Sequence, residues 1–338
     1  MKIPGNVLIT RIDSIGDVVL ALPVAGELKK HFPGIKVGLI GAPYTKAIVD
    51  ACVHIDSFID VSDFVQKEIF IAGQKPQAII HLNTNAALSE RAAKLGIPIR
   101  IGTMSRLFHW KYCNKLVWLS RTYEGFHEID GNLKLLKPFG INKKYSHEEM
   151  AGLYGLNKIE SLSPELNSLL DKTKFNIILH PKSKGNAREW PLYNFIELIN
   201  SLDPATYNIF ISGVENEKKY VHQIVDSVSV PVHDISGKIP LEQFIPFIAS
   251  SDGIVSSSTG PLHLAAALGI NALGIYSSLK GKDIARWGPI GYKTQAFALI
   301  KDCSDCKVAK DHCVCINSIL PSTIKVALDK LANEKLGL

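Results

Sequence analysis

The sequence predicts an α/β protein built from two doubly wound parallel-sheet domains. Short apolar runs alternate with segments of helical spacing along nearly all of the 338 residues. These runs are almost continuous, as in parallel strands that helices cover on both faces. The alternation stops in a polar segment near residues 142–174 and then resumes. Because a chain of this length favours two domains, we expect one over residues 1–160 and another over residues 161–338, with the final helix as a candidate to pack back on the first.

The first half opens on an apolar strand at residues 6–10, which leads through a loop into a helix with apolar spacing as far as Leu28 and His31. Similar strand-and-helix pairs follow. The expected strands cover residues 36–41, 57–59, 77–82 and 99–102, and the expected helices cover residues 44–52, 86–95 and 127–140. In such a sheet the ligands bind beyond the carboxyl ends of the strands, so the loops there are the candidate sites.

The second half repeats this order. Its expected strands cover residues 175–180, 207–213, 252–255 and 271–276. Four helices are expected: one after the loop of residues 181–191, one that begins near residue 214, one over residues 240–249 and one that begins near residue 260. The last of these helices should end at Gly269, because glycine adopts the left-handed conformation that follows many helices.

The turn before this last helix predicts an anion-binding site. Residues 256–259 carry four hydroxyl groups, and Gly260 and Pro261 open the helix, which leaves backbone N–H groups accessible at the positive end of its dipole. His263 follows within one turn and offers another donor. An ordinary Ser/Thr cap beside a hydrogen-bonded histidine explains the same stretch equally well.

The charge and hydropathy of the chain limit the ligands and the cellular location that we expect. Residues 1–150 contain 19 basic and 14 acidic side chains, which gives this half most of the net charge of +6. This excess is too small for a nucleic-acid-binding arm but suits an acidic ligand or an anionic membrane surface. No apolar run approaches the roughly 20 residues of a membrane span, and the start leads into a strand rather than a signal peptide. We therefore expect a cytoplasmic protein.

Basic and aromatic side chains are interleaved between Arg100 and Arg121. They include Arg106, His109, Trp110, Lys111, Tyr112, Lys115 and Trp118. One interpretation is a surface for a phosphorylated or lipid-linked partner, and the other is a connecting loop whose rings pack on the sheet. The sequence does not choose between them.

Four of the six cysteines are clustered near the end of the chain, at Cys303, Cys306, Cys313 and Cys315. In a cytosolic protein such clustering suggests a structural zinc site before disulfides, although the spacing departs from the usual paired knuckles. Reduced thiols in a loop remain the main alternative.

The motifs in the loops, taken together, resemble the lipopolysaccharide heptosyltransferases of glycosyltransferase family nine, across nearly the whole chain. They are Arg11-x-x-Ser14-x-Gly16-Asp17, the run from Lys184 to Trp190-Pro191, Gly213-x-x-x-Glu217, Thr259-Gly260-Pro261-Leu262-His263 and Trp287-Gly288-Pro289. The resemblance implies a GT-B fold, with two Rossmann-like domains facing a cleft. It also implies inverting transfer of heptose from ADP-heptose to the lipopolysaccharide inner core, by an enzyme peripheral to the inner face of the inner membrane.

The resemblance also assigns residues. Asp17 matches the catalytic base, with Asp13 as its rival in the same loop. The donor-binding positions are Ser183, Lys184, Arg188, Glu217, Ser258, Thr259, Gly260 and His263, where Arg188 faces the diphosphate and Glu217 the ribose. The expected acceptor-binding positions are Arg11, Ser14, Arg106, Lys111 and Arg121. Many family members have aspartate where this chain has Ser258, which leaves the donor sugar and a divalent cation open.

Simpler roles compete with these assignments. Asp17 is also a suitable helix cap, Arg188 a suitable surface cation and Glu217 a suitable first-turn acid.

Two other classes of protein compete with a glycosyltransferase. An NAD-dependent oxidoreductase is disfavoured, because the loop after the first strand has one glycine, Gly16, rather than a spaced triplet. An inactive sugar-nucleotide binding protein is the other, and the sequence does not exclude it.

Overall fold

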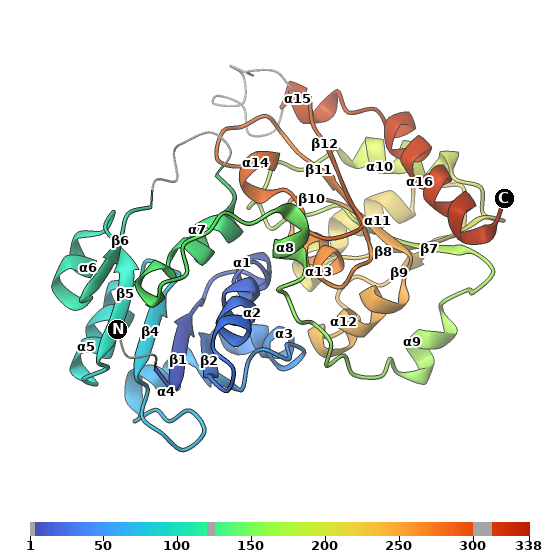
Figure 1. The fold of residues 1–338 in the computed structure, drawn as a ribbon. Coiled ribbons are helices and arrows are strands. Elements are labelled where there is room, and N and C mark those ends of the chain that lie inside the picture. Colours follow the sequence, from blue (N-terminus) through green and yellow to red (C-terminus); the bar gives the residue numbers. More distant parts are fainter. Residues whose placement is uncertain (1–3, 120–125, 300–312) are drawn as a thin grey trace. The chain divides into compact units, whose positions relative to one another are not determined.

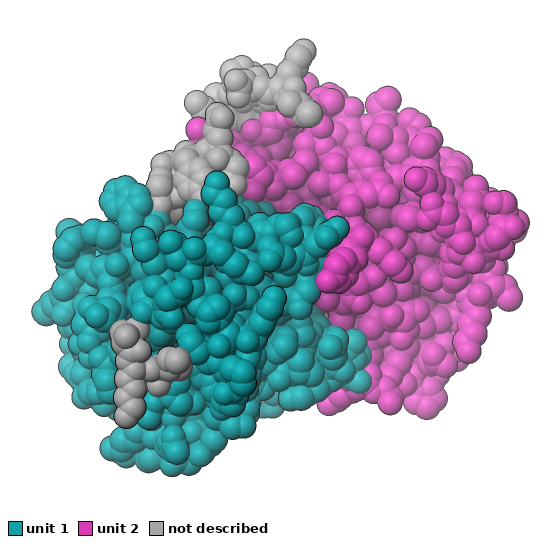
Figure 2. Space-filling model, in the orientation of Figure 1, with its two compact units in different colours: residues 1–159 teal, residues 160–338 magenta. Residues whose placement is uncertain are grey.

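The chain divides into two compact units, residues 1–159 and residues 160–338 (Figure 2). The computed structural model describes residues 4–119, 126–299 and 313–338. The final helix, α16 (Pro321–Leu336), belongs to the second unit, where it packs on α10 (Leu192–Ser201) and β7 (Phe175–His180).

The first unit contains a six-stranded parallel sheet in the order β3-β2-β1-β4-β5-β6 (Figure 1). The strands are β1 (Asn6–Thr10), β2 (Lys36–Gly41), β3 (Ser57–Asp60), β4 (Ala78–His81), β5 (Ile99–Thr103) and β6 (Lys115–Val117). All five residues of β1 are buried, because this strand lies at the centre of the sheet between β2 and β4. The nearly continuous apolar runs in the sequence reflect this burial on both faces.

Short helices connect these strands. They are α1 (Ile15–Val19), α2 (Leu22–His31), η1 (Pro43–Thr45), α3 (Lys46–Asp50), α4 (Val61–Gln66), α5 (Ala86–Lys94), α6 (Leu107–Tyr112), α7 (Glu128–Lys134), η2 (Lys137–Phe139) and α8 (His147–Ala151). The helix expected after β1 is divided in two, because α2 begins afresh with Pro23 in its first turn. Side chains from β1, β2, β4 and the helices beside them, such as Leu8, Ile40 and Ile79, form a fully buried core cluster.

The second unit repeats the strand order of the first. Its parallel sheet runs β12-β11-β10-β7-β8-β9, so that the first and fourth strands of the unit, β7 and β10, are again central neighbours. The remaining bounds are β8 (Tyr207–Ile211), β9 (His233–Asp234), β10 (Gly253–Ser257), β11 (Asn271–Ile275) and β12 (Thr294–Phe297). This strand order and its parallel pairing confirm the predicted doubly wound architecture.

The helices of this unit are α9 (Pro164–Ser168), α10, η3 (Glu215–Glu217), α11 (Lys218–Val225), α12 (Leu241–Ser250), α13 (Gly260–Ala267), α14 (Ile284–Trp287), α15 (Val314–Asn317) and α16. Gly269 follows α13 with φ of 75°, as the sequence predicts. Trp190, 1% exposed, packs edge-on against Phe195, and its indole N–H donates to the Ile319 carbonyl at 2.9 Å.

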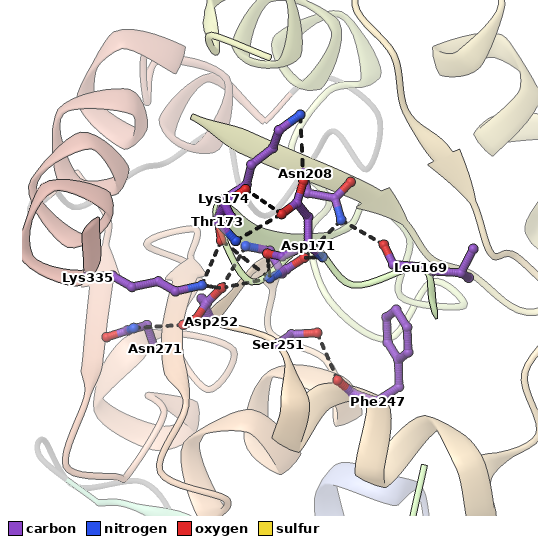
Figure 3. Close-up of polar contacts among 11 residues, drawn as sticks. Leu169, Asp171, Thr173, Lys174, Asn208, Phe247, Ser251, Asp252, Asn271 and Lys335 are labelled. Atoms are coloured by element: carbon purple, nitrogen blue, oxygen red, sulfur yellow. Dashed lines mark hydrogen bonds and ion pairs between the residues drawn. The ribbon is translucent and has the colours of Figure 1, made fainter. Parts of the chain in front are cut away.

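A network of hydrogen bonds and ion pairs connects residues at the amino-terminal edge of the second sheet (Figure 3). The Asp252 carboxylate accepts from the Asn176 backbone N–H at 2.7 Å and from Lys335 Nζ of α16 at 2.6 Å. Asn176 Oδ1 in turn accepts from Asn208 Nδ2 at 2.9 Å and from the Asp171 N–H at 2.9 Å. These bonds tie three strands, a loop and the last helix together, so this edge has a structural role.

Candidate functional site

The first candidate region lies at the carboxyl edge of the first sheet, between β1 and β4. The chain leaves β1 toward β2 and leaves β4 toward β5 on the other side, which makes this the topological switch point where doubly wound sheets bind ligands. Thr10 Oγ1, at the end of β1, donates to Asn83 Oδ1 at 2.6 Å and links the two loops. Arg11 follows β1 directly, and Asp17 lies in the first turn of α1.

Arg11 is the centre of this region. Its guanidinium is buried, with 4% exposure, and donates to the Leu82 carbonyl at 3.3 Å and to Asp17. Its Nε lies 3.3 Å from the Asp13 carboxylate, and Nη2 lies 3.5 Å from Glu128, whose side chain is buried in α7. Burial disfavours the charged form, but the charges of Asp17, Glu128 and Asp13 outweigh it and raise the pKa of Arg11. One buried cation therefore organises three carboxylates.

Asp17 has both carboxylate oxygens engaged in the first turn of α1. One accepts from Arg11 and the other from Ser14 Oγ at 2.6 Å, and the side chain is 18% exposed. Burial acts to raise the pKa of Asp17, but Arg11 and Ser14 outweigh it and hold that pKa below its ordinary value. The group is thus an oriented, ionised carboxylate at the switch point. Asp13, 46% exposed, is held through Arg11 Nε and is the more solvated of the two.

Arg11 and Ser14, which the sequence suggested as acceptor contacts, both bind Asp17. Their geometry suits them to position that carboxylate. Arg106 and Lys111 are exposed on the N-cap and the body of α6, at the β5–β6 side of the sheet. Arg121 lies outside the described residues.

The second candidate region is the carboxyl edge of the second sheet, where β7 and β10 end and α13 begins. Thr259 is the N-cap of α13, but its side chain does not cap the helix. Its Oγ1 lies instead 2.8 Å from Ser256 Oγ, which donates to the His180 carbonyl at 2.9 Å. No capping oxygen from Thr259 therefore covers the first N–H groups of α13, and Gly260 adds no side chain there. His263, 2% exposed, lies one turn further.

The loop after β7 is folded around two glutamates. Glu189 Oε1 accepts from the Ser183 N–H at 2.7 Å and from Ser183 Oγ at 2.8 Å, and Glu189 also pairs with Lys182. The backbone then turns through φ of 52° at Lys184 and 74° at Gly185. Such positive φ values are costly for lysine, so the surrounding bonds must hold this turn.

Glu217 provides one of those bonds. Its side chain accepts from the Lys184 N–H at 3.1 Å and from the Val214 N–H at 3.0 Å, and the residue is 5% exposed. It thus joins the loop after β7 to the loop after β8. A cavity of about 600 Å³ lies between these loops. It is lined by Lys182, Lys184, Gly185, Glu189, Val214, Glu215, Asn216, Glu217 and Tyr220.

Sequence reasoning missed two buried groups at these edges. His180, the last residue of β7, lies with Nδ1 2.9 Å from Ser212 Oγ, and burial lowers its pKa to about 4, against the opposing charges of Glu217 and Glu189. Its place at the end of a predicted strand, just before a basic loop, could have revealed it. Glu128 gave no comparable signal, because its partner Arg11 is far away in the sequence.

The zinc prediction remains untested. Cys303 and Cys306 lie outside the described residues, while Cys313 and Cys315 are buried with their sulfurs 3.2 Å apart. In the part of the chain that the structure describes, no group of three or more histidine, cysteine and acidic side chains is arranged to hold a metal ion. Within the same residues, no helix has the length and apolar character needed to span a bilayer.

Two parallel-sheet domains of the same strand order, together with the match to a glycosyltransferase family model and the similarity to solved heptosyltransferase structures, define the protein as a GT-B glycosyltransferase. The chain belongs to glycosyltransferase family 9 (heptosyltransferase), whose family model matches residues 85–316. The fold class and the family resemblance predicted from the sequence are both confirmed.

Individual relatives agree with this assignment. A candidate glycosyltransferase of Haemophilus influenzae is 26% identical over 300 residues, which cover 84% of this chain and 86% of the relative. The lipopolysaccharide core heptosyltransferase OpsX of the same organism is 20% identical over 284 residues, covering 81% and 79%. The structure of ADP-heptose lipopolysaccharide heptosyltransferase II of E. coli is similar with a TM-score of 0.76 at 15% identity, over 98% of this chain and 99% of that one.

Proposed function

We propose that the protein transfers heptose from ADP-heptose to the inner core of lipopolysaccharide, with the acceptor bound by the first unit and the donor by the second. Membership of the heptosyltransferase family and the names of its relatives support this substrate pair. The reaction is a single displacement. The acceptor oxygen bonds to the anomeric carbon, the bond from that carbon to ADP breaks, and the hydroxyl proton goes to a base.

The arrangement around Asp17 carries this proposal. A sugar hydroxyl is a weak nucleophile, so a positioned carboxylate must accept its proton as the new bond forms. Asp17 is ionised, fixed by Arg11 and Ser14, and located at the switch point of the first sheet. Arg11 and Ser14 therefore act as positioning residues, and Asp13 is the second candidate base.

The residues proposed to bind the donor, in the second unit, would stabilise the leaving group of the same reaction. As the bond to ADP breaks, negative charge develops on the diphosphate, which cations and helix-end N–H groups stabilise. Lys184, Arg188 and the start of α13 at Gly260 are suited to this task. His263 and Ser183 add donors nearby, and Glu217, already fixed between two loops, is our candidate for the ribose hydroxyls. A divalent cation is left open by the change to Ser258, and transfer with and without a chelator tests whether one takes part.

Ser258 supports a second candidate, a different nucleotide sugar. Many members of the family have aspartate at this position, directly before Thr259. The contacts to the donor sugar should therefore differ there. The experiment is a thermal-shift screen of ADP-heptose and other ADP, UDP, GDP and CMP sugars, because a ligand of the native state raises the melting temperature. A transfer assay on an inner-core acceptor, with and without EDTA, follows.

Each outcome selects one candidate. Stabilisation by ADP-heptose with transfer of heptose supports the main proposal. Stabilisation and transfer with another sugar alone replaces the donor. Binding of a nucleotide sugar without transfer to any acceptor leaves a sugar-nucleotide binding protein.

The acceptor also has a place in this proposal. Arg106 and Lys111 are exposed cations of the first unit and suit phosphate groups of a lipid-linked acceptor, with Arg121 as a third candidate from the sequence. An acceptor of this kind is anchored in a membrane, so we expect the protein to work at the cytoplasmic face of the inner membrane as a peripheral enzyme.

A further inference from the structure

Three large apolar side chains are exposed around α6 and the edge strand β6. Leu107 is 89% exposed, Trp110 is 56% exposed and Trp118 is 73% exposed. Leu107 and Trp110 are three residues apart on α6 and therefore lie on one face of that helix. Exposed tryptophans are unusual in a soluble protein when they are grouped with other apolar residues, and such groups mark interaction surfaces.

Backbone contacts bring Trp118 to the same place. Trp110 Nε1 donates to the Met104 carbonyl at 3.0 Å, and the Met104 N–H donates to the Val117 carbonyl at 2.9 Å. Trp118 follows Val117 directly, so its backbone lies beside Met104, whose carbonyl the Trp110 indole contacts. We call the surface formed by Leu107, Trp110 and Trp118 the apolar edge.

The charge around the apolar edge has one sign. Residues 91–123 contain seven lysine and arginine residues and no acidic residue. Arg106, Lys111 and Lys115 are exposed, whereas the Arg100 guanidinium donates to the carbonyls of Tyr112 and Ile97 within the unit. The acid that precedes this run, Glu90, pairs with Lys94 at 2.9 Å, and the acid that follows it, Glu124, lies outside the described residues.

We infer that the apolar edge inserts into an anionic membrane surface, with Arg106, Lys111 and Lys115 against the lipid headgroups. Indoles are enriched at the boundary between headgroups and acyl chains, and the Trp110 N–H already donates to the Met104 carbonyl, so this ring can enter the boundary without losing a hydrogen bond to water. An apolar surface rimmed by cations binds anionic bilayers through both burial and charge. A protein partner would need a matching acidic surface, whereas the bilayer supplies negative charge over any area.

This docking proposal depends on the proposed lipid-linked acceptor. It specifies the side of the first unit from which that acceptor would approach Asp17. Met104 and Trp118 directly follow β5 and β6, so the apolar edge lies at the same carboxyl edge of the sheet as Asp17. Three strand spacings separate β1 from β6 in the sheet, roughly 15 Å in all. A membrane-anchored acceptor bound beside the apolar edge would thus present its sugars toward the candidate base.

The test is flotation of the full-length protein with vesicles of phosphatidylcholine alone or of equal parts phosphatidylcholine and phosphatidylglycerol. The Leu107→Ser/Trp118→Ser variant should bind anionic vesicles roughly tenfold or more weakly than the wild type. The Arg106→Gln/Lys111→Gln/Lys115→Gln variant should lose the preference for anionic vesicles, by about fivefold for each cation removed. Val65→Ser/Phe70→Ser, at two other exposed apolar residues of this unit, is the matched control and should bind like the wild type.

Transfer to a water-soluble, delipidated acceptor separates the docking surface from the proposed function. We expect Leu107→Ser/Trp118→Ser to keep wild-type activity on that acceptor and to lose activity on an acceptor embedded in vesicles. Vesicle binding by this variant equal to that of the wild type would overturn the docking proposal. A second result would also overturn the docking proposal: the wild type binds no vesicles, light scattering shows that it is a dimer, and the Leu107→Ser/Trp118→Ser variant is a monomer. The apolar edge would then contact a second copy of the chain. Absence of transfer by the wild type to either acceptor would instead count against the proposed function.

Discussion

The carboxyl edges of the two sheets share a strand order but differ in charge. In the first unit, one buried cation, Arg11, holds Asp13, Asp17 and Glu128 around it. In the second, the carboxylates of Glu189 and Glu217 accept hydrogen bonds from their own loops, beside the lysines of the loop after β7 and a helix start at α13 that the Thr259 side chain does not cap. The sheet thus provides the position of a site, while the loops decide whether it presents a carboxylate or binds an anion. We therefore assign base chemistry to the first edge and donor binding to the second.

The largest effect should follow from removing the carboxylate of the first edge. Asp17→Asn keeps the size of the side chain but cannot accept a proton, so kcat should fall by about 10²–10⁴. Asp13→Asn is the matched control and should lose clearly less, since its carboxylate is more exposed. Steady-state transfer kinetics measure both variants. An inactive Asp13→Asn beside an active Asp17→Asn would exchange the two assignments.

A smaller effect is expected from the cation of the second edge. Arg188→Ala should weaken binding of the ADP-sugar by about 1.5–3 kcal/mol, the range for a hydrogen bond to a charged group. Calorimetric titration measures this change, and Lys219→Ala, an exposed lysine of α11, is a suitable control. An unchanged affinity of Arg188→Ala would remove this residue from the donor site.

Each edge also contains a buried neutral histidine at a strand end, and this shared feature makes stability depend on pH. Burial lowers the pKa of His81 to about 3, and neither of its ring nitrogens has a hydrogen-bond partner among the described residues. The unfolded chain therefore takes up a proton near pH 6.5 that the folded chain takes up only near pH 3. Stability should fall as the pH drops through this window, by about 1.4 kcal/mol per pH unit.

Urea unfolding between pH 7 and pH 4 measures that slope. His81→Leu should flatten it by about one proton, and Ile79→Val, a buried position in the same strand without a titratable group, should leave it unchanged. If the slopes of the wild type and His81→Leu coincide, His81 is not the group that titrates.

The smallest effect belongs to the amino-terminal edge of the second sheet, which lies at the opposite end from the donor site. Lys335→Gln removes the ion pair with Asp252, a partly exposed pair, and should lower the free energy of unfolding by about 0.5–1 kcal/mol. Donor affinity should not change, since the network has no residue in the donor loops. A weaker donor affinity in this variant would show that the two edges are coupled.

Much of the fold could be predicted because buried parallel strands leave an apolar run in the sequence. β1, β2 and β7 begin and end at the predicted residues. α6 and β6 were not predicted as elements, because aromatic and basic residues obscure the period of such short segments. At the candidate site, the loop residues were visible as motifs, whereas the pairing of Arg11 with Glu128 depends on the tertiary fold.

The division of labour between the two edges is tested most directly by titrating ADP-heptose into Asp17→Asn in a calorimeter. A base acts on the acceptor hydroxyl and has no part in holding the nucleotide, so we predict the wild-type dissociation constant in this slow variant. Arg188→Ala provides the reference for a true loss of donor binding. A loss of affinity in Asp17→Asn as large as that in Arg188→Ala would contradict the account, because the first edge would then belong to the donor site.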